Sequence, residues 1–459
     1  MNIDPTIFKS YDIRGIYPQQ INEDNISEII KAIYKFFTTK IDKPGFTVGL
    51  ARDMRISSPS FYKIAIETLV SLGANVIDMG MLSTPTFYFA IYNYKYDAGI
   101  QITASHNPKE YNGAKFVLSG PNGLIKIGKA TGMEDVKNYA VAGVDLPIDK
   151  KGNVTVKEHI MEDEVENASK VLGNPNIKKF KIVADPANAM GGTFIDALFK
   201  KYEAELVRMN FELDGTFPVH APNPLEAENL VDLQKRVIEE KADLGLAPDG
   251  DGDRIFFIDE KGQVVPPTII TSLVARELLK EYRGSKILFD IRYILTPKKI
   301  VEELGGIPVI TKVGHAFITE ELEKTGGIFA GESSGHYYLQ STGNAESSVA
   351  IILAVLKVLT EENKAFSEIV KELQKSFESG EFNYKVTNAQ EIIASIKNDY
   401  KDGELSELDG IAISYPTWRF SVRTSNTEPL LRLNVEGYDK EEMKKHKEEL
   451  INRIESLKK

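Results

Sequence analysis

The chain has 459 residues, which is too long for one hydrophobic core and predicts three or four domains. It contains no cysteine, which excludes disulfides, thiolate metal sites and cysteine nucleophiles. It also shows no apolar run near the ~18 residues of a membrane span and no N-terminal secretory signal, so we expect a cytoplasmic protein. The net charge of -11 argues against nucleic acid as a partner, but it leaves room for a local cluster of Arg and Lys that binds a phosphorylated small molecule.

Three stretches of the chain share one predicted order of elements, which is strand, helix, strand, helix, strand. In the first stretch the strands are expected at 46–51, 75–79 and 98–102, with a helix near 58–72. In the second, strands at 181–184, 204–208 and 242–246 alternate with helices near 192–201 and 226–240. In the third, strands at 286–289, 307–310 and 327–330 alternate with helices near 297–304 and 316–324. Strands that alternate with helices predict βαβ units and mostly parallel sheets.

The last part of the chain has another pattern. A helical stretch at 345–373 is followed by strand-like runs at 410–415, 419–423 and 430–435 and by a charged amphipathic helix at 439–459. We therefore predict an α/β fold with three similar βαβ-type mixed-sheet domains and a smaller α+β C-terminal domain. The expected domains span 1–152, 153–256, 257–370 and 371–459.

Polar loops follow the last strand of each of the three similar stretches. They are 105–107 (Ser-His-Asn), 249–253 (Asp-Gly-Asp-Gly-Asp) and 332–336 (Glu-Ser-Ser-Gly-His). Ligands of open α/β sheets bind beyond the carboxyl ends of the strands, so these loops are expected to line one cleft. The alternative is that they are ordinary polar connections.

The first of these loops presents one serine, Ser105, in a short polar turn after a strand-like run. Pro108 stops a helix from continuing through it. A serine hydroxyl placed in this way can act as a nucleophile or carry a phosphoryl group.

The 249–253 loop predicts a metal site, because its glycines let the backbone wrap so that three carboxylates meet at one point. Three hard oxygen ligands suit Mg²⁺ or another hard cation. An EF-hand loop would have glycine at its sixth position, where this chain has Arg254, and the residues that follow resemble a strand. A solvated acidic turn is the other alternative, although three clustered carboxylates repel one another without a cation.

Two further loops suggest phosphate and sugar binding. The 423–429 run (Arg-Thr-Ser-Asn-Thr-Glu-Pro) combines a guanidinium with hydroxyl, amide and backbone N–H groups, which favours an anion site. It lacks the lysine of a nucleotide P-loop, and its alternative is a polar turn between two strands. The 331–336 run offers a carboxylate, hydroxyls and an imidazole to sugar hydroxyl groups.

Together these loops resemble the α-D-phosphohexomutase superfamily, in its order and over nearly the whole chain. The nearest likeness is to the phosphomannomutase/phosphoglucomutase group, on Tyr11-Asp-Ile-Arg-Gly15 and Ser425-Asn-Thr427. Phosphoglucosamine mutases usually have another N-terminal motif and a glycine where Asn426 stands. The resemblance implies four domains around a central cleft and an enzyme that interconverts hexose 1-phosphate and hexose 6-phosphate.

The resemblance also implies a role for each matching residue. Phosphoryl transfer would involve Ser105, which would be phosphorylated, and His106, Lys115 and Arg254. Mg²⁺ would be bound by Ser105, Asp249, Asp251 and Asp253. Substrate would be bound by Tyr11, Arg14, Arg292, His315, Glu332, Ser334, His336, Arg423, Ser425, Asn426 and Thr427.

The implied reaction passes through a sugar bisphosphate, which also serves as the activator. Phospho-Ser105 donates its phosphoryl group to the free hydroxyl of a monophosphate, with His106 or Lys115 as the base. The bisphosphate reorients and returns its other phosphate to the serine. The expected partner is a mannose or glucose phosphate, and the expected assembly is a monomer or homodimer.

Two segments depart from the family pattern. The 292–294 segment is Arg-Tyr-Ile where the family usually has Lys and small residues, and 343–346 is Gly-Asn-Ala-Glu where many members have an acidic pair and glycine. These departures motivate one alternative, a phosphosugar-binding protein without turnover, and phosphoglucosamine mutase is a second. A phosphatase of the haloacid-dehalogenase class is disfavoured, because its Asp-x-Asp-Gly-Thr/Val motif is absent from the sequence.

Overall fold

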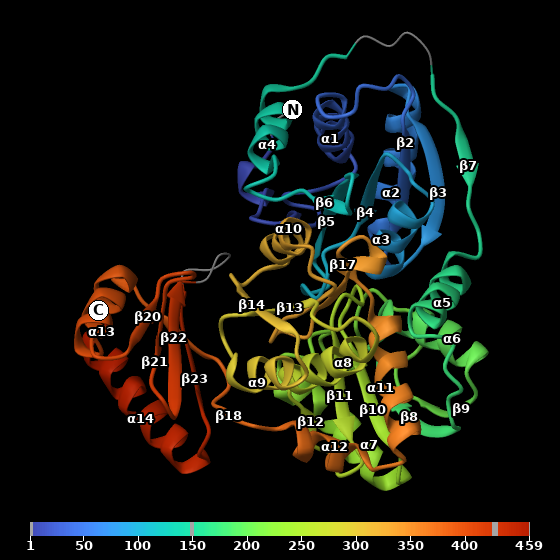
Figure 1. Cartoon of the computed structure of the whole chain (residues 1–459). Helices are drawn as coiled ribbons and strands as arrows, with labels where there is room; N and C mark the ends of the chain where they lie inside the picture. Colours follow the sequence, from blue (N-terminus) through green and yellow to red (C-terminus); the bar gives the residue numbers. More distant parts are fainter. Residues whose placement is uncertain (1–2, 147–150, 425–429, 459) are drawn as a thin grey trace. The chain divides into compact units, whose positions relative to one another are not determined.

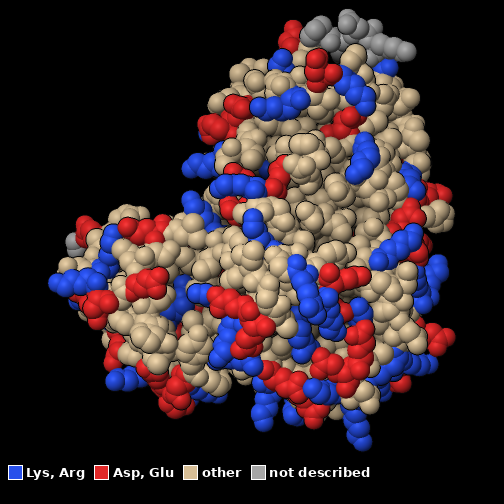
Figure 2. Space-filling view, in the orientation of Figure 1, with Lys and Arg blue, Asp and Glu red and all other residues tan. Residues whose placement is uncertain are grey.

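The computed structural model describes residues 3–146, 151–424 and 430–458. It divides into two compact units, which we call unit 1 (Met1–Val265 and Ser334–Ser367) and unit 2 (Pro266–Ser333 and Glu368–Lys459). Lys and Arg side chains are interspersed with Asp and Glu on the face drawn in Figure 2. Among the described residues, no helix combines the length and the apolar character needed to cross a membrane.

The first sheet of unit 1 has the strand order β1-β5-β4-β2-β3-β7, with β6 paired to β5 (Figure 1). The strands β2, β3, β4 and β7 are parallel, whereas β1, β5 and β6 are antiparallel to their neighbours. The strands are β1 (Ile13–Ile16), β2 (Thr47–Arg52), β3 (Asn75–Met81), β4 (Ala98–Ile102), β5 (Tyr111–Ser119), β6 (Leu124–Lys126) and β7 (Val154–Val156). The accompanying helices are η1 (Pro5–Ile7), α1 (Ile26–Thr38), α2 (Ser58–Ser71), α3 (Thr84–Asn93) and α4 (Met133–Ala142).

This sheet is covered on both faces, which explains why all five residues of β4 are buried. One hydrophobic cluster joins the strands to α1, α2 and α4, and a second joins them to α3. The helix α3 approaches closely because Gly49 and Gly99 lack side chains. A Cβ atom on these glycines would lie 2.4 Å and 2.6 Å from the Ile91 Cδ1 atom.

The second sheet of unit 1 has the strand order β12-β11-β10-β8-β9, in which β8, β9 and β10 are parallel. Its strands are β8 (Phe180–Ala184), β9 (Ala204–Arg208), β10 (Leu244–Pro248), β11 (Ile255–Asp259) and β12 (Val264–Val265). The helices are α5 (Ile160–Val171), α6 (Gly191–Lys201), η2 (Ala227–Leu230), α7 (Val231–Glu240) and α11 (Ser348–Glu362), which packs on α5 and α6. Unit 1 also holds the antiparallel pair β16 (Tyr337–Leu339) and β17 (Ala345–Glu346), which flanks η3 (Gln340–Thr342).

Unit 2 begins with three parallel strands in the order β14-β13-β15. These are β13 (Lys286–Asp290), β14 (Ile307–Thr311) and β15 (Phe329–Gly331), with α8 (Pro267–Glu281), α9 (Leu295–Glu303) and α10 (His315–Thr325). An antiparallel sheet follows in the order β18-β23-β22-β21-β20, with β19 on β23. Its elements are β18 (Phe377–Glu378), β19 (Phe382–Lys385), α13 (Ala389–Asp399), β20 (Glu404–Ser406), β21 (Ile411–Ser414), β22 (Trp418–Thr424), β23 (Leu430–Gly437) and α14 (Lys440–Leu457).

The predicted α/β class is confirmed, because parallel strands alternate with helices in both units and an antiparallel sheet closes the chain. The expected helix at 345–373 was wrong as one element. Residues 345–346 are a strand, and α11 ends at Glu362, where Asn363 takes a left-handed conformation before α12 (Phe366–Leu373). The expected helix at 226–240 is a 3-10 turn followed by α7. The four domain boundaries stay predictions.

Candidate active site

Ser105 lies in the turn between β4 and β5 of unit 1. Its φ of +52° is left-handed, a conformation that costs a non-glycine residue about 1–2 kcal/mol. The side chain is almost fully buried, and the backbone N–H donates to the Thr103 Oγ1 atom at 3.0 Å. The Ser105 Oγ atom lies 3.2 Å from the Nδ1 atom of His106. The turn thus holds the hydroxyl group beside an imidazole.

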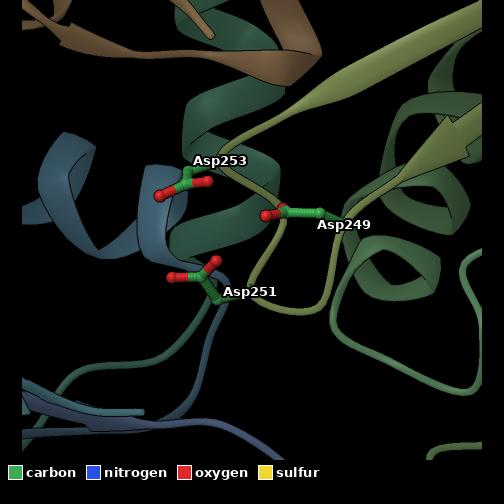
Figure 3. Close-up of side chains that lie close together, drawn as sticks. All are labelled: Asp249, Asp251 and Asp253. Atoms are coloured by element: carbon green, nitrogen blue, oxygen red, sulfur yellow. The ribbon is translucent and has the colours of Figure 1, made fainter. Parts of the chain in front are cut away.

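The acidic loop, Asp249–Asp253, joins β10 to β11 at the carboxyl end of the parallel strands. Gly252, with φ +80°, allows the tight turn, and the Asp249 Oδ1 atom accepts the N–H groups of Gly252 (3.0 Å) and Arg254 (3.2 Å). The three carboxylates point toward one another (Figure 3), and one oxygen from each lies within 4.8 Å of the others. All three side chains are buried.

These carboxylates have the chemistry of a site for a hard cation. Among the described residues, no group donates a hydrogen bond to Asp249 Oδ2 or Asp251 Oδ1, although both oxygens are buried. Burial and the charges of Asp253 and Asp251 raise the pKa of Asp249 well above its ordinary value. A buried, unsatisfied anionic oxygen is costly, and a divalent cation would offset that cost.

Lys115 brings a positive charge to the same carboxylates. From β5, its Nζ atom lies 2.6 Å from Asp251 Oδ2 and 2.6 Å from Asp253 Oδ2. Burial lowers the pKa of this ammonium group, but the charges of Asp251 and Asp253 outweigh burial and raise it well above the ordinary value. Lys115 therefore stays protonated while both carboxylates face it.

His336 and Arg254 complete the surroundings of the acidic loop. The His336 Nε2 atom lies 3.2 Å from Asp253 Oδ1 and 3.3 Å from Arg254 Nε, while its Nδ1 atom lies 3.0 Å from the Ser334 hydroxyl. Burial raises the pKa of Asp253, but Lys115 and His336 outweigh it and hold the pKa well below its ordinary value. The pKa values of Asp249 and Asp253 thus shift in opposite directions, because Lys115 lies 2.6 Å from Asp253 whereas the Nε atom of Arg254 is 3.9 Å from Asp249.

The serine turn and the acidic loop meet. A Cβ atom on Gly250 would lie 2.5 Å from the carbonyl oxygen of Ser105, so only glycine fits there. The His106 Nδ1 atom, which contacts the Ser105 hydroxyl, is 3.9 Å from Asp249 Oδ2. Burial, followed by the charges of Arg254 and Arg14, lowers the pKa of His106 well below its ordinary value, which leaves a neutral imidazole. Ser105 and Gly250, which are 145 positions apart in the chain, are therefore neighbours.

Other predicted residues of unit 1 flank this pair of loops. Arg14 in β1 pairs with Asp12 at 2.6 Å and donates to the side chain of Asn107 in the serine turn. Tyr11 precedes β1 and packs beside Gly128.

Thr84 and Arg55 also belong to the site, and the sequence did not single them out. Thr84, at the start of α3, donates to Asp251 Oδ2 at 2.6 Å, and Arg55 donates to the serine turn. The sequence carries no signal for either contact, because the partners are distant in the chain or are backbone atoms.

A second group of predicted residues lies in unit 2. Arg292 pairs with Asp290 at 2.9 Å and with Glu332 at 3.1 Å; although burial lowers its pKa, these carboxylates outweigh burial and raise it. The Arg423 Nη2 atom lies 3.2 Å from Glu381, which also pairs with Arg432 at 3.3 Å.

The remaining predicted residues of unit 2 are His315 and the phosphate loop. His315 is the first residue of α10, and its carbonyl oxygen accepts from the Thr319 hydroxyl at 2.8 Å. Ser425, Asn426 and Thr427 lie outside the described residues.

Comparison with known proteins identifies the family of the chain. Models of the phosphoglucomutase/phosphomannomutase family match in four consecutive parts: alpha/beta/alpha domain I at 5–131, domain II at 163–262, domain III at 266–377 and the C-terminal domain at 356–453. The chain belongs to the phosphoglucomutase/phosphomannomutase family. This confirms the predicted four-domain fold class and the resemblance drawn from the loops.

Individual relatives agree with this result. The mutase is 35% identical to the phosphomannomutase of Escherichia coli K12 over 441 aligned positions, covering 94% of this chain and 95% of that protein. It is 37% identical to the phosphomannomutase of Methanocaldococcus jannaschii over 466 aligned positions, covering 99% and 98% of the two chains. A crystal structure of a phosphoglucomutase/phosphomannomutase family protein from Burkholderia thailandensis superposes with a TM-score of 0.86 at 28% identity and covers 99% of this chain and 98% of its own. The protein is a phosphohexomutase.

Proposed function

We propose that the mutase interconverts the 1- and 6-phosphates of mannose or glucose, with Ser105 carrying the phosphoryl group between the two positions. The observation that carries the proposal is the meeting of the serine turn with the acidic loop across Gly250. A phosphorylatable hydroxyl, an imidazole and three carboxylates then share one buried site. The phosphomannomutases among the relatives support the choice of sugar.

In the proposed reaction, the bond between phosphorus and the Ser105 oxygen breaks as the free hydroxyl of a hexose monophosphate bonds to phosphorus. The neutral imidazole of His106 would take the proton of that hydroxyl, whereas Lys115, the other predicted base, keeps its own proton beside Asp251 and Asp253. The hexose bisphosphate then turns within the site and returns its other phosphate to Ser105, which releases the isomeric monophosphate. Exclusion of water protects the phosphoserine, and the near-complete burial of Ser105 favours this.

The acidic loop would hold Mg²⁺ together with the phosphorylated Ser105, because Asp249, Asp251 and Asp253 each offer one buried oxygen that accepts no hydrogen bond among the described residues. When bound, the ion would neutralise part of the charge on the transferring phosphoryl group. Arg254, 3.9 Å from Asp249 through its Nε atom, would bind the same phosphoryl oxygens.

Substrate recognition is assigned to three sets of residues. Sugar hydroxyl groups would be bound by Glu332 and Ser334. Further contacts with the substrate are assigned to Tyr11, Arg14, Arg292, His315 and His336. The phosphate that does not react would be held by Arg423 with Ser425, Asn426 and Thr427. Arg423 supports this, because its side chain is 1% exposed and its Nε atom has no hydrogen-bond partner among the described residues.

We also propose domains at 1–152, 153–256, 257–370 and 371–459, a monomer or homodimer, and a cytoplasmic location. A sugar bisphosphate is the proposed activator, since it would phosphorylate a bare Ser105.

A coupled assay with glucose 1-phosphate, mannose 1-phosphate and glucosamine 1-phosphate, primed with the matching bisphosphate, tests the proposed substrates. We expect turnover with the first two and none after Ser105→Ala, while Ser119→Ala, at the exposed end of β5, keeps full activity. Preference for glucosamine 1-phosphate would move the enzyme to the phosphoglucosamine group. Full turnover in Ser105→Ala would discard the phosphoserine.

A further inference from the structure

The backbone of the serine turn points its carbonyl groups inward. The oxygens of Ser105, Asn107, Pro108 and Tyr111 all face one buried side chain, that of Arg55. Arg55 lies between β2 and α2 and is 1% exposed. A strained turn with inward carbonyls needs donors at several points to keep its shape.

The Arg55 guanidinium supplies one N–H donor for each of these four carbonyl oxygens. Its Nη2 atom donates to Ser105 at 2.7 Å and to Asn107 at 2.6 Å. Its Nη1 atom donates to Pro108 at 2.8 Å and to Tyr111 at 3.0 Å. The four N–H groups of the two terminal nitrogens therefore reach four different carbonyl oxygens. A lysine ammonium, with three donors on one atom, cannot span them.

Arg55 is itself fixed from other sides. Its Nε atom lies 3.2 Å from the buried carboxylate of Asp53, which also accepts the Ser58 hydroxyl at 2.5 Å. The ring of Phe217 stacks on the guanidinium, 5.2 Å from its Cζ atom, and a Cβ atom on Gly215 would lie 2.8 Å from the Arg55 Cα atom. This packing leaves the guanidinium one orientation.

The segment that covers Arg55 also reaches the acidic loop. Pro222, five residues after Phe217, accepts the N–H group of Gly250 at 3.0 Å. The Ser105 carbonyl oxygen lies between the guanidinium and Gly250, in contact with both. Arg55 thus sits where the serine turn, the acidic loop and the 215–222 segment come together.

We infer that Arg55 is a positioning residue for phosphoryl transfer, which holds the left-handed Ser105 turn against the acidic loop without touching substrate. The inference rests on the proposed function of Ser105. Arg55 is expected to affect the rate of phosphoryl transfer and not the binding of the hexose phosphate, because other residues are proposed to bind that substrate.

Arg55→Lys tests the inference, with Arg52→Lys as the matched control. Arg52 is three residues away and donates to Asp53 O and Met81 Sδ, with no hydrogen bond to the serine turn. We expect the rate constant for phosphorylation of Ser105 by glucose 1,6-bisphosphate, followed by intact mass after rapid quenching, to fall about 10- to 100-fold in Arg55→Lys. The KM of hexose phosphate should change less than about threefold. Arg52→Lys should behave as wild type.

The final fraction of protein that becomes phosphorylated distinguishes a positioning role of Arg55 from a loss of folded protein. A positioning role lowers the rate constant at full amplitude, whereas a rate constant near that of wild type, with or without lower amplitude, overturns the inference. If Arg55→Lys does not fold, Asp53→Asn is the alternative variant, because it keeps the guanidinium and removes its anionic partner. We then expect the rate constant for phosphorylation of Ser105 to fall at least about threefold, and no fall would overturn the inference. Wild-type protein that turns over without phosphorylating Ser105 would instead defeat the proposed function.

Discussion

The carbonyl oxygen of Ser105 lies against Gly250 so closely that a Cβ atom on the glycine would sit 2.5 Å from it. A β-carbon cannot occupy that position unless backbone moves. The contact joins the turn that presents the hydroxyl group to the loop that gathers three carboxylates. The geometry of the site therefore depends on the absence of one side chain.

Gly250→Ala should push the serine turn away from the acidic loop and lower kcat at least about tenfold, because transfer requires close alignment. Gly284→Ala is the control. Gly284 has open space but a φ of +74°, so alanine there should cost about 1 kcal/mol of unfolding free energy and leave kcat unchanged. A Gly250→Ala enzyme with the kcat of wild type would show that the contact does not matter.

Asp249→Asn separates the acidic loop's binding of a cation from its folding. The substitution keeps the Oδ1 acceptor and removes a buried charge beside Asp251 and Asp253, so in EDTA the free energy of unfolding should rise by about 1–3 kcal/mol. Wild-type protein should gain about 2.7 kcal/mol in Mg²⁺ at 100 times its Kd, and the variant should gain almost nothing. Denaturant titrations with and without Mg²⁺ measure both effects. Equal stabilisation of the two proteins by Mg²⁺ would contradict the metal assignment.

Glu346 lies in the 343–346 segment and forms a buried ion pair with Lys126 at 2.5 Å. The ammonium group also lies 4.8 Å and 4.9 Å from the ring centres of Tyr88 and Tyr338. Lys126→Met should cost about 3–5 kcal/mol by leaving a carboxylate unpaired, and adding Glu346→Leu should recover most of that loss.

The exposed pair of Lys43 and Asp97 provides the control for this ion pair, since Lys43→Met should cost less than about 1 kcal/mol. Free energies of unfolding in urea are measured for wild type and the three variants. A double variant no more stable than Lys126→Met would mean that the pair is not coupled.

Glu164, a buried residue of unit 1 outside the site, should make the free energy of unfolding depend on pH. Burial raises its pKa to about 7, although the hydroxyls of Thr86 and Ser347 oppose this. The folded state therefore keeps a proton that the unfolded chain has lost, so stability falls as pH rises from about 4.5 to about 7, by about 3 kcal/mol in total, and is then constant.

Glu164→Gln should remove this slope, while Glu162→Gln on the exposed side of α5 should keep it. The measurement is the free energy of unfolding across that range of pH. Parallel profiles for wild type and Glu164→Gln would rule out the buried proton.

Three strands with mostly apolar sequences could be predicted closely. Expected strands at 46–51, 98–102 and 286–289 match β2, β4 and β13 within one residue at each end, because strands buried on both faces select mainly apolar residues. β5 was missed, since the polar residues Asn112 and Lys115 interrupt its apolar pattern, and Lys115 contacts the acidic loop. The single helix expected at 345–373 is instead the strand β17 followed by the two helices α11 and α12, because the apolar composition of this segment does not indicate that a helix ends at Asn363.

Some residues of the site could likewise be predicted from the sequence, and others could not. The loops that carry Ser105 and the three aspartates were predicted, because their residue types are chemically distinctive. Arg55 was not, because its partners are backbone carbonyl groups, which leave no trace in a sequence. Thr84 was missed because 167 residues separate it from Asp251.

The most direct test of the account is the phosphorylation state of Ser105 during turnover. Protein treated with glucose 1,6-bisphosphate and freed of excess sugar should carry one phosphate, which peptide mapping places on Ser105. Addition of mannose 1-phosphate or glucose 1-phosphate should remove that phosphate at a rate no slower than kcat. Turnover by protein that carries no phosphate on Ser105 at any stage would contradict the account.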